Sequence, residues 1–458
     1  MNYFDDEIEK KEQEEYMRRK RARKKRLMQE ERKRKKKLRR TIILSALTAF
    51  VIAILLILKL IIGFIGSLTK EEEPPEVEQP KEPQVYNASI ISAGDLVPHS
   101  PFIDSTVYKQ ADGSYDYSPI FTYIKDNYAS ADYAILNLEC TISDGDYSGH
   151  PLFRTPDAMT KAIAENGIDM CLLANNHIYD NFDDGLTLTS NALDNFSLDY
   201  AGIRNSTEAK TYTVKDINGI KVGIFNYTYE TEMQNGQKTI NALPVSSVSA
   251  PLINSFNYGN LDSFYETIQS DMASMKTDGV EYTIAYIHWG NEYELTESDI
   301  QNEMAQKLCD LGIDMLIGSH PHCVQPVDLL TSNTEDHKMV CLYSVGNHVS
   351  NQLREYIPPL PNGHSEDGLM VKINLEQTDD GPVSLTNVEF LPTWTFCRKT
   401  DDGSSEYFIL PVDNPGEVKE KTSDLNTGSE IDESLSRTTQ IINDGVEKVT
   451  NALPITNK

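Results

Sequence analysis

The sequence predicts an α/β domain that follows a single transmembrane helix, and three observations support this prediction. Residues 41–58 contain no charged side chain, and the apolar run resumes after Lys59 up to residue 68. Beyond residue 85, short apolar runs alternate with helical patterns of about 10–15 residues, which is typical of α/β domains. Polar residues that can bind metals follow directly after several of the apolar runs.

The N-terminal tail, residues 1–40, is strongly basic. It holds 18 Lys and Arg against 9 Asp and Glu, whereas the whole chain has a net charge of −28, so that residues 41–458 carry −37. Basic residues beside an apolar span orient the N-terminus toward the cytoplasm and bind anionic lipid. We prefer this interpretation to a nucleic-acid patch, because the acidity of the remaining chain argues against nucleic acid as a partner.

The apolar segment, residues 41–68, is longer than the about 20 residues of helix that a bilayer core requires. Lys59 lies past the middle of the segment, so its long side chain can extend toward the interface. A buried core helix or a cleaved signal peptide would also be apolar, but the basic flank and the lack of an Ala-x-Ala-like cleavage site favour a span. We therefore expect a single-pass protein of the cell membrane with its C-terminal domain extracellular.

Polar segments flank the predicted domain. Residues 69–84 are rich in Glu and Pro, which is typical of a stiff, solvated stalk. The folded domain is expected over residues 85–411. The acidic residues 412–458 are expected to form a C-terminal tail, in which 430–452 show weak helical spacing. The six cysteines include no CxxC pair and indicate no disulfide framework.

Periodicity predicts the elements of the domain. Strands are expected over residues 89–93, 133–138, 170–173, 222–227, 282–288, 315–317 and 340–343. Helices are expected over residues 156–166, 185–196, 261–277 and 296–311. Two later strands, 368–375 and 384–393, follow one another without a helix, so we expect an antiparallel edge or a second sheet.

Polar clusters follow five of the predicted strands, at the edge where α/β sheets bind ligands. Gly94 and Asp95 come after the first strand, where the glycine allows a tight turn. Asn137 and Glu139 end the second strand and share a face at a period of two. Each pattern alone also fits an ordinary turn or strand end.

The third cluster combines two amides with an imidazole. Asn175, Asn176 and His177 directly follow the apolar run over 170–173. This combination fits either a hydrogen-bonded turn or a ligand site. Asp180 lies three residues further on and is placed to hold a ring nitrogen of the imidazole.

Histidines end two further strands. His288 ends the strand over 282–288 and by itself also fits a structural histidine. His320 and His322 flank Pro321, which we expect to hold His320 in an extended conformation. Two imidazoles at this spacing can converge on one ion or on two neighbouring ions.

Taken together, the five clusters predict a metal centre at one sheet edge. The residues placed there are Asp95, Glu139, Asn176, His177, His288, His320 and His322. Imidazole, carboxylate and amide ligands suit Mn, Fe or Zn better than Ca. Two such ions about 3.5–4 Å apart would clamp an oxyanion.

The order of these motifs resembles that of the CapA family, which is associated with poly-γ-glutamate capsule synthesis and belongs to the calcineurin-like metallophosphoesterase fold group. The resemblance covers about residues 90–352. It rests on Gly-Asp, Asn-Leu-Glu, Ala-Asn-Asn-His, His-Trp-Gly and His-Pro-His in this order, with Ser-Val-Gly-Asn after them. It implies a four-layer α/β/β/α sandwich of metallophosphoesterase type.

The resemblance also implies roles for individual residues. The metal ligands would be Asp95, Glu139, Asn176, His288, His320 and His322. Glu139 would take the place of the aspartate that bridges both metals in related phosphoesterases. His177 would be the general acid, with Asp180 beside it. The substrate would meet Asn137, Asn175, Glu292, Tyr293 and Asn347.

The sequence departs from the wider phosphoesterase pattern in the first loop. That loop has no Asp-x-His, and the nearest histidine is His99, four residues after Asp95. Cys140, directly after Glu139, stands where a smaller residue is expected. We therefore expect one or two divalent metal ions.

These features predict a membrane-anchored protein of capsule or poly-γ-glutamate biosynthesis or export, with a metal-dependent hydrolase-like site. Its expected partners are other membrane subunits of a polymer synthesis complex and the cell-surface polymer itself. Two alternatives stay open. One is a phosphoesterase, or an amide-cleaving or epimerising enzyme, acting on another envelope polymer. The other is a non-catalytic subunit that binds polymer or partners.

Overall fold

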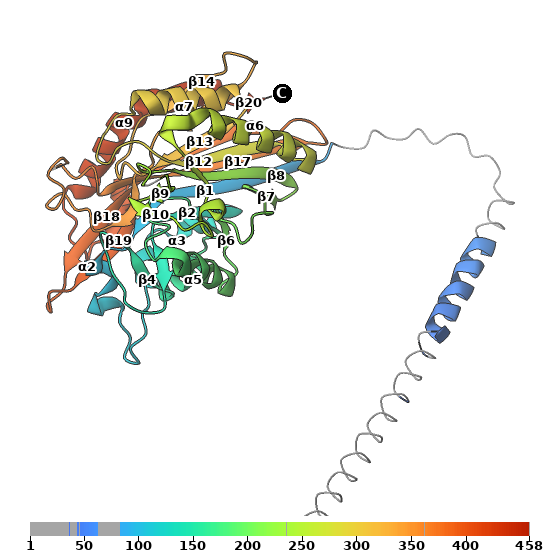
Figure 1. The fold of residues 1–458 in the computed structure, drawn as a ribbon, viewed down its shortest axis with the longest axis horizontal. Coiled ribbons are helices and arrows are strands. Elements are labelled where there is room, and N and C mark those ends of the chain that lie inside the picture. Colours follow the sequence, from blue (N-terminus) through green and yellow to red (C-terminus); the bar gives the residue numbers. More distant parts are fainter. Residues whose placement is uncertain are drawn as a thin grey trace, which may run out of the picture. The chain divides into compact units, whose positions relative to one another are not determined.

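The computed structural model describes Lys36, Leu44 and residues 46–62, 83–234, 236–360 and 362–457. The chain divides into two units, residues 1–82 and Pro83–Lys458. In the first unit, residues 46–62 are helical with exposed apolar side chains (Figure 1). No helix within the described ranges is long and apolar enough to cross a membrane. The span predicted over 41–68 lies partly outside these ranges, as do the basic tail and the stalk.

The first sheet of the second unit is built around the long strand β1 (Val85–Val97). Its other members are β2 (Tyr133–Leu138), β5 (Met170–Leu172), β6 (Asp199–Ala201), β16 (Asn347–Ser350), β17 (Asp367–Thr378), β18 (Ser384–Lys399), β19 (Ser405–Pro411) and β20 (Ile455–Thr456). Their order is β19-β18-β17-β1-β2-β5-β6, with β16 paired to β1 and β20 to β18. β1, β2, β5 and β6 are parallel, whereas β17, β18 and β19 make up an antiparallel edge.

The second sheet stacks on the first. Its strands are β7 (Tyr212–Ile217), β8 (Ile220–Tyr229), β11 (Ser255–Phe256), β12 (Tyr282–His288), β13 (Met315–Ser319), β14 (Val327–Thr331) and β15 (Lys338–Leu342). The order is β11-β8-β12-β13-β15-β14, with β7 paired to β8. β8, β12, β13 and β15 run parallel, so their carboxyl ends meet at one edge. Two short ladders, β3 (Thr141–Ser143) with β4 (Arg154–Pro156) and β9 (Thr239–Ile240) with β10 (Leu243–Pro244), lie outside the sheets.

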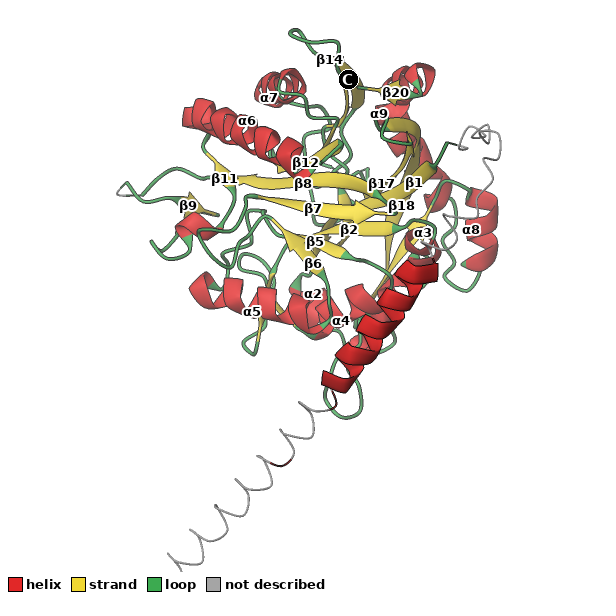
Figure 2. Cartoon of the chain, turned by 90° about the vertical axis from the view of Figure 1, so that its right-hand side faces the viewer, coloured by secondary structure: helices red, strands yellow, loops and turns green. Residues whose placement is uncertain are grey.

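Helices cover the outer face of each sheet. The α-helices are α2 (Ser100–Ile103), α3 (Lys125–Ala129), α4 (Ala158–Glu165), α5 (Phe182–Asn195), α6 (Leu261–Asp278) and α7 (Asp299–Asp310), and the 3-10 helices are η1 (Thr106–Tyr108), η2 (Ser118–Phe121), η3 (Ala250–Leu252) and η4 (Tyr258–Asn260). In Figure 2, α6 and α7 lie on one side of the two sheets and α2, α4 and α5 lie on the other.

Three apolar cores hold these layers together. One core lies between the two sheets and includes Ile90 and Ile224. Another joins the first sheet to α4, through residues such as Leu136 and Ile163. The third joins the second sheet to α6 and α7. Helix, sheet, sheet and helix follow one another, so the domain is a mixed α/β fold with two stacked sheets, and the predicted α/β class is confirmed.

The C-terminal segment folds onto this domain. It contains α8 (Pro415–Lys421) and α9 (Glu430–Ala452), and α9 packs on β14, β17 and β18. The apolar residues at helical spacing in α9 point into the core, where Ile442 and Val449 are buried. The compact unit therefore extends to the C-terminus, and residues 412–458 are not the separate polar tail that their composition predicts.

The predicted elements of the domain correspond to elements in the structure, with ends shifted by a few residues. β2 and β12 have the predicted bounds, and α6 ends one residue later than predicted. The two late strands form the antiparallel edge of the first sheet. The six cysteines are free, in line with the absence of a disulfide framework.

Candidate metal centre

The predicted site residues come from the carboxyl ends of strands in both sheets. Asp95 lies near the end of β1 and Glu139 follows β2, both in the first sheet, whereas His288 ends β12 and His320 follows β13 in the second. The sequence predicted one sheet edge, and the structure corrects this. The β7–β8 hairpin starts a second sheet. β8 pairs with β7 and β12, and it pairs with no strand of the first sheet.

Asp95 is fully buried and is held in place by three neighbours. Asn137 Nδ2 donates to its Oδ1 at 2.6 Å, and the backbone N–H of His320 donates to its Oδ2 at 3.2 Å. His322 Nδ1 lies 3.3 Å from the same Oδ2. Gly94 is required here, since a Cβ would lie 2.0 Å from a backbone oxygen of the facing loop.

Glu139 is the centre of the site. Its side chain is fully buried, and neither carboxylate oxygen has a hydrogen-bond partner among the described residues. His288 Nε2 lies 3.6 Å and His322 Nε2 3.7 Å from Glu139 Oε1. Burial, and then the negative charge of Asp95, raise the pKa of Glu139 well above its ordinary value. A cation between the two carboxylates would reverse this effect.

The second sheet contributes two histidines that stay neutral. His288 Nδ1 lies 2.9 Å from Ser319 Oγ, and its Nε2 lies 2.8 Å from Asn176 Oδ1. His320 Nε2 lies 3.2 Å from Tyr229 OH, while its Nδ1 has no partner within the described chain. Burial holds the pKa of both histidines well below the ordinary value. The neutral imidazole is the form that binds a metal.

The His320-Pro321-His322 segment has an unusual backbone. His320 has φ of 97° and His322 has φ of 56°, both in the left-handed region. The extended conformation predicted for His320 from Pro321 is therefore wrong. The hydrogen bond from the His320 N–H to Asp95 favours the observed conformation. Asn347 Oδ1 lies 3.0 Å from His322 Nδ1 and orients this ring.

These side chains form two groups that could each hold a metal ion. One group is Glu139, His320 and His322, and the other is Asp95, Glu139 and His288. In each group, the ligand atoms all lie within 4.8 Å of one another. A bound cation would satisfy the Glu139 oxygens and the His320 Nδ1, which have no partner among the described residues. The donor set therefore fits a metal, and Glu139 is common to both groups.

His177 and Asp180 form a pair beside these groups. His177 Nδ1 lies 2.7 Å from Asp180 Oδ2, and the pair is buried. The ring of Phe153 packs edge-on against His177, with centroids 4.5 Å apart. The backbone N–H of Phe153 and Asn241 Nδ2 donate to Asp180, at 2.6 Å and 3.2 Å. These contacts fix the orientation of the imidazole ring.

The remaining predicted residues surround the groups. Asn175 Nδ2 donates to Leu138 O at 2.9 Å, while Asn175 Oδ1 accepts from the His177 N–H, so Asn175 shapes the loop. Tyr293 is half-buried, and its ring centroid lies 6.2 Å from that of His322. Glu292 is exposed. Asn137, Asn175 and Asn347 are buried, so the structure gives them supporting contacts, and their predicted contact with a substrate stays a prediction.

The sequence comparisons identify the family to which this arrangement belongs. Residues 89–352, more than half of the chain, match the family model of the bacterial capsule synthesis protein PGA_cap. The chain belongs to this family. All residues of the two metal-binding groups lie within the matched range.

Two curated relatives are similar to this chain. The capsule biosynthesis protein CapA of Bacillus anthracis is 25% identical over 261 residues, which cover 55% of this chain and 53% of that protein. The PGA biosynthesis protein CapA of Bacillus subtilis (strain 168) is 22% identical over 373 residues, which cover 78% of this chain and 87% of that protein. The chain thus spans about half the length of the first relative and most of the second.

Three residues that contact the PGA_cap site were not predicted. Tyr229 ends β8 and could have been found by the rule that polar residues at strand ends gather at a site. Phe153 and Asn241 lie outside the sheets and have no sequence pattern that indicates their role. His99 packs on Phe153 at 5.0 Å, and burial lowers its pKa to about 4. Within the described chain, His99 belongs to neither metal-binding group.

Proposed function

We propose that this PGA_cap protein takes part in the biosynthesis or export of capsular poly-γ-glutamate through a metal-dependent, hydrolase-like site. Residues 41–68 would anchor the chain in the cell membrane, with the basic tail on anionic lipid at the cytoplasmic side and the domain outside. Other membrane subunits and the polymer would be its partners. Membership of the family and the names of the relatives support the pathway, and the clustered ligands support the chemistry.

The observation that carries the catalytic proposal is the sharing of Glu139 between two ligand groups. A carboxylate with both oxygens buried and unpartnered is costly in a folded protein. Metal ions held by this carboxylate would satisfy both oxygens, and they would account for the position of Glu139 beside histidines of the second sheet. We therefore propose two divalent ions, with Mn, Fe or Zn favoured by the mixture of imidazole and carboxylate donors.

The proposed ligands divide into two sets that share Glu139. Asp95, Glu139 and His288 would hold one ion, with Asn176 beside His288. Glu139, His320 and His322 would hold the other. When bound, such ions polarise a phosphoryl or carbonyl oxygen as Lewis acids.

His177 supplies the acid–base function in this proposal. Asp180 holds Nδ1 of His177, which would leave Nε2 to donate a proton to a leaving group. Phe153 excludes water from one face of the ring and Asn241 fixes the carboxylate of Asp180. Tyr293 and the exposed Glu292 would line the entrance. The substrate would be a phosphoester or an amide of an envelope polymer.

The test uses the full-length chain purified in detergent. Bound Mn, Fe and Zn are measured by mass spectrometry, and turnover is measured on phosphoesters and on γ-glutamyl peptides. His177→Gln should retain the metal and lose turnover by about 10²–10⁴-fold, as expected for a general acid. His337→Gln is the matched control, because His337 has the same exposed fraction of 7% but lies away from the site.

Two results would reject the catalytic proposal. One is a wild-type chain that takes up none of the three metals. The other is turnover that His177→Gln leaves unchanged. If polymer output in cells is unimpaired by His177→Gln but lost on deletion of the chain, the protein acts as a non-catalytic binding or scaffold subunit.

A further inference from the structure

The loop over residues 289–298 joins β12 to α7 and carries Glu292 and Tyr293, which would line the entrance of the site. It contains neither helix nor strand. A loop of this kind depends on contacts with the surrounding scaffold for a fixed position. Its main neighbour is the loop over residues 320–326, between β13 and β14, which carries His320 and His322. We call these two segments the entrance loop and the ligand loop.

Gln325 of the ligand loop holds the entrance loop through its side chain. The residue is fully buried, and its Nε2 donates to Glu294 O at 2.9 Å and to Thr296 O at 3.0 Å. Its Oε1 accepts from Gln301 Nε2 at 3.0 Å. Glu294 O also accepts from Cys323 Sγ, at 3.1 Å. Both amide hydrogens of Gln325 therefore go to the entrance loop.

Gln301, in the first turn of α7, holds both ends of the entrance loop. This residue is buried, and its Oε1 accepts from the Ser298 N–H at 3.0 Å, at the end of the loop. Gly290 lies at the start of the loop with φ of 82°, and a Cβ there would lie 2.8 Å from the Gln301 side chain. Gln301 and Gln325 thus contact the entrance loop at its start, middle and end.

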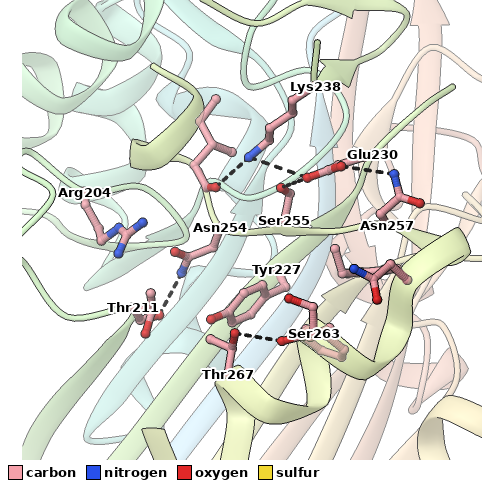
Figure 3. Close-up of a pocket in the computed structure, with 14 residues that line it drawn as sticks. Arg204, Thr211, Tyr227, Glu230, Lys238, Asn254, Ser255, Asn257, Ser263 and Thr267 are labelled. Atoms are coloured by element: carbon pink, nitrogen blue, oxygen red, sulfur yellow. Dashed lines mark hydrogen bonds and ion pairs between the residues drawn. The ribbon is translucent and has the colours of Figure 1, made fainter. Parts of the chain in front are cut away.

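The start of the entrance loop is also held by η4. Tyr258 OH accepts from the Gly290 N–H at 3.1 Å. Asn257, the N-cap of η4, donates from Nδ2 to Glu230 Oε2 at 3.2 Å. Figure 3 shows this contact in the wall of a cavity of about 340 Å³ beside β8. Glu230 therefore anchors η4 and, through Tyr258, the start of the entrance loop.

Tyr293 is the entrance residue that these contacts place beside the metal ligands. Its backbone has φ of 65°, in the left-handed region that is unfavourable for a residue with a Cβ. The Tyr293 N–H donates to Pro321 O at 2.8 Å, between His320 and His322. Its ring centroid lies 6.2 Å from that of His322. A backbone of this kind persists only where neighbouring contacts fix it, and Gln325 supplies two of these contacts.

We propose that Gln325 is a positioning residue, which holds the entrance loop so that Tyr293 contacts the substrate beside His322. The contact with a substrate rests on the proposed function, whereas the hold on the loop does not. Loss of the Gln325 amide should release the entrance loop and leave the metal ligands in place. The ligand loop is held separately, because the Gln325 N–H donates to Ser344 O at 3.0 Å and Asn347 orients His322.

The first measurement is hydrogen–deuterium exchange of the full-length chain in detergent and EDTA, with Gln325→Met compared with the wild type. Methionine keeps the length of the side chain and removes the amide. Exchange in the peptide that covers residues 289–298 should become about fivefold or more faster, because the loss of a hydrogen bond lowers protection by about this factor. This measurement requires neither metal nor turnover.

Gln377→Met is the matched control. Gln377 is also a buried glutamine, and its Nε2 also donates two hydrogen bonds, to Glu281 Oε1 and Gly381 O. Glu281 precedes β12, at the strand end opposite His288. Gln377→Met should therefore leave exchange over residues 289–298 as in the wild type.

The second measurement is turnover of bis(p-nitrophenyl) phosphate and of γ-glutamyl p-nitroanilide. On a probe that the wild type hydrolyses, Gln325→Met should raise KM about fivefold or more, since it weakens a contact that binds the substrate. Both kcat and the bound metal should stay within about twofold of the wild type, because the ligands and His177 are unaltered.

Any of three results would overturn the proposal. The first is unchanged exchange over residues 289–298 in Gln325→Met. The second is equally fast exchange there in Gln377→Met, which would show a general loss of stability. The third is a fall in kcat or in bound metal with KM unchanged. If the wild type hydrolyses neither probe, the proposed function fails, and the exchange measurement alone decides whether Gln325 positions the loop.

Discussion

The substitution Glu139→Gln tests two properties of this side chain separately. One is the cost of burying its carboxylate, and the other is its proposed role as a metal ligand. In the metal-free chain, both oxygens of Glu139 are buried without a partner among the described residues, and the carboxylate of Asp95 lies nearby. Glutamine has the same shape and no charge. Glu139→Gln should therefore stabilise the metal-free protein, which is the reverse of the usual effect of substitution in a site.

The size of the effect follows from the burial. The amide of glutamine is still buried, but it lacks the charge, and removal of the charge from an unsatisfied buried group is worth about 1–3 kcal/mol. With an unfolding entropy of about 2.1 cal/mol/K per residue over the unit Pro83–Lys458, each kcal/mol shifts Tm by about 1 °C. Metal at a hundred times its Kd stabilises the wild type by about 2.7 kcal/mol, and the variant should lose most of this gain.

The assay is thermal unfolding in EDTA and again with added Mn or Zn. The expected result is a crossing, in which the variant has the higher Tm without metal and the wild type with metal. Glu376→Gln is the control. Glu376 is exposed on β17, so the substitution should leave Tm unchanged both in EDTA and with added metal. A variant that melts below the wild type in EDTA would refute the argument that the Glu139 carboxylate is unsatisfied. Equal metal-induced shifts in both proteins would refute its role as a ligand.

Three further predictions concern single contacts. Asn241→Ala removes the amide donor to the His177–Asp180 pair and should lower turnover by about tenfold with bound metal unchanged; an unchanged rate would show that the amide is not needed. Burial raises the folded-state pKa of Asp367 from 3.8 to about 6, so its protonation stabilises the fold below pH 4, and this contribution is lost as pH rises to 6. In urea unfolding, Asp367→Asn should reduce the change in unfolding free energy between pH 4 and pH 6 by about 3 kcal/mol. An unchanged pH dependence of the unfolding free energy would contradict the raised pKa of Asp367. Gly445→Ala places a Cβ 1.7 Å from a backbone oxygen of β14 and should cost about 1–3 kcal/mol of unfolding free energy, whereas no loss would mean that α9 does not pack there.

The central strands of the two sheets could be predicted from the sequence because they are buried on both faces. Such strands are nearly continuous apolar runs, which are recognisable without tertiary information. β2 and β12 show this, since every residue in both strands is buried. The site residues could be found for a related reason. A polar side chain directly after such a run interrupts the pattern, as Glu139 and His288 do, and interruptions at strand ends gather at ligand-binding edges.

The arrangement of the strands could not be read in the same way. Whether β8 extends the first sheet or starts a second depends on the β7–β8 hairpin and on pairing with β12, which are contacts distant in sequence. The helical spacing over 430–452 predicted α9, but its packing on the domain was missed because α9 is polar on most of its surface and has few buried positions. The predicted extended backbone of His320 was wrong because the hydrogen bond from its N–H to Asp95 outweighs the local preference set by Pro321.

The two-sheet origin of the site also explains why the sequence contains its ligands in separate short motifs. Asp95 and Glu139 are fixed by the first sheet, and His288 and His320 by the second, so their distances depend on how the sheets pack on the core between them. A metal bound by both sets would tie the two sheets together at the edge where that core ends. Core substitutions between the sheets, such as Ile224→Val, should therefore weaken metal binding although Ile224 belongs to neither metal-binding group. Retention of full metal affinity in a measurably destabilised Ile224→Val chain would show that the site is held by its loops alone.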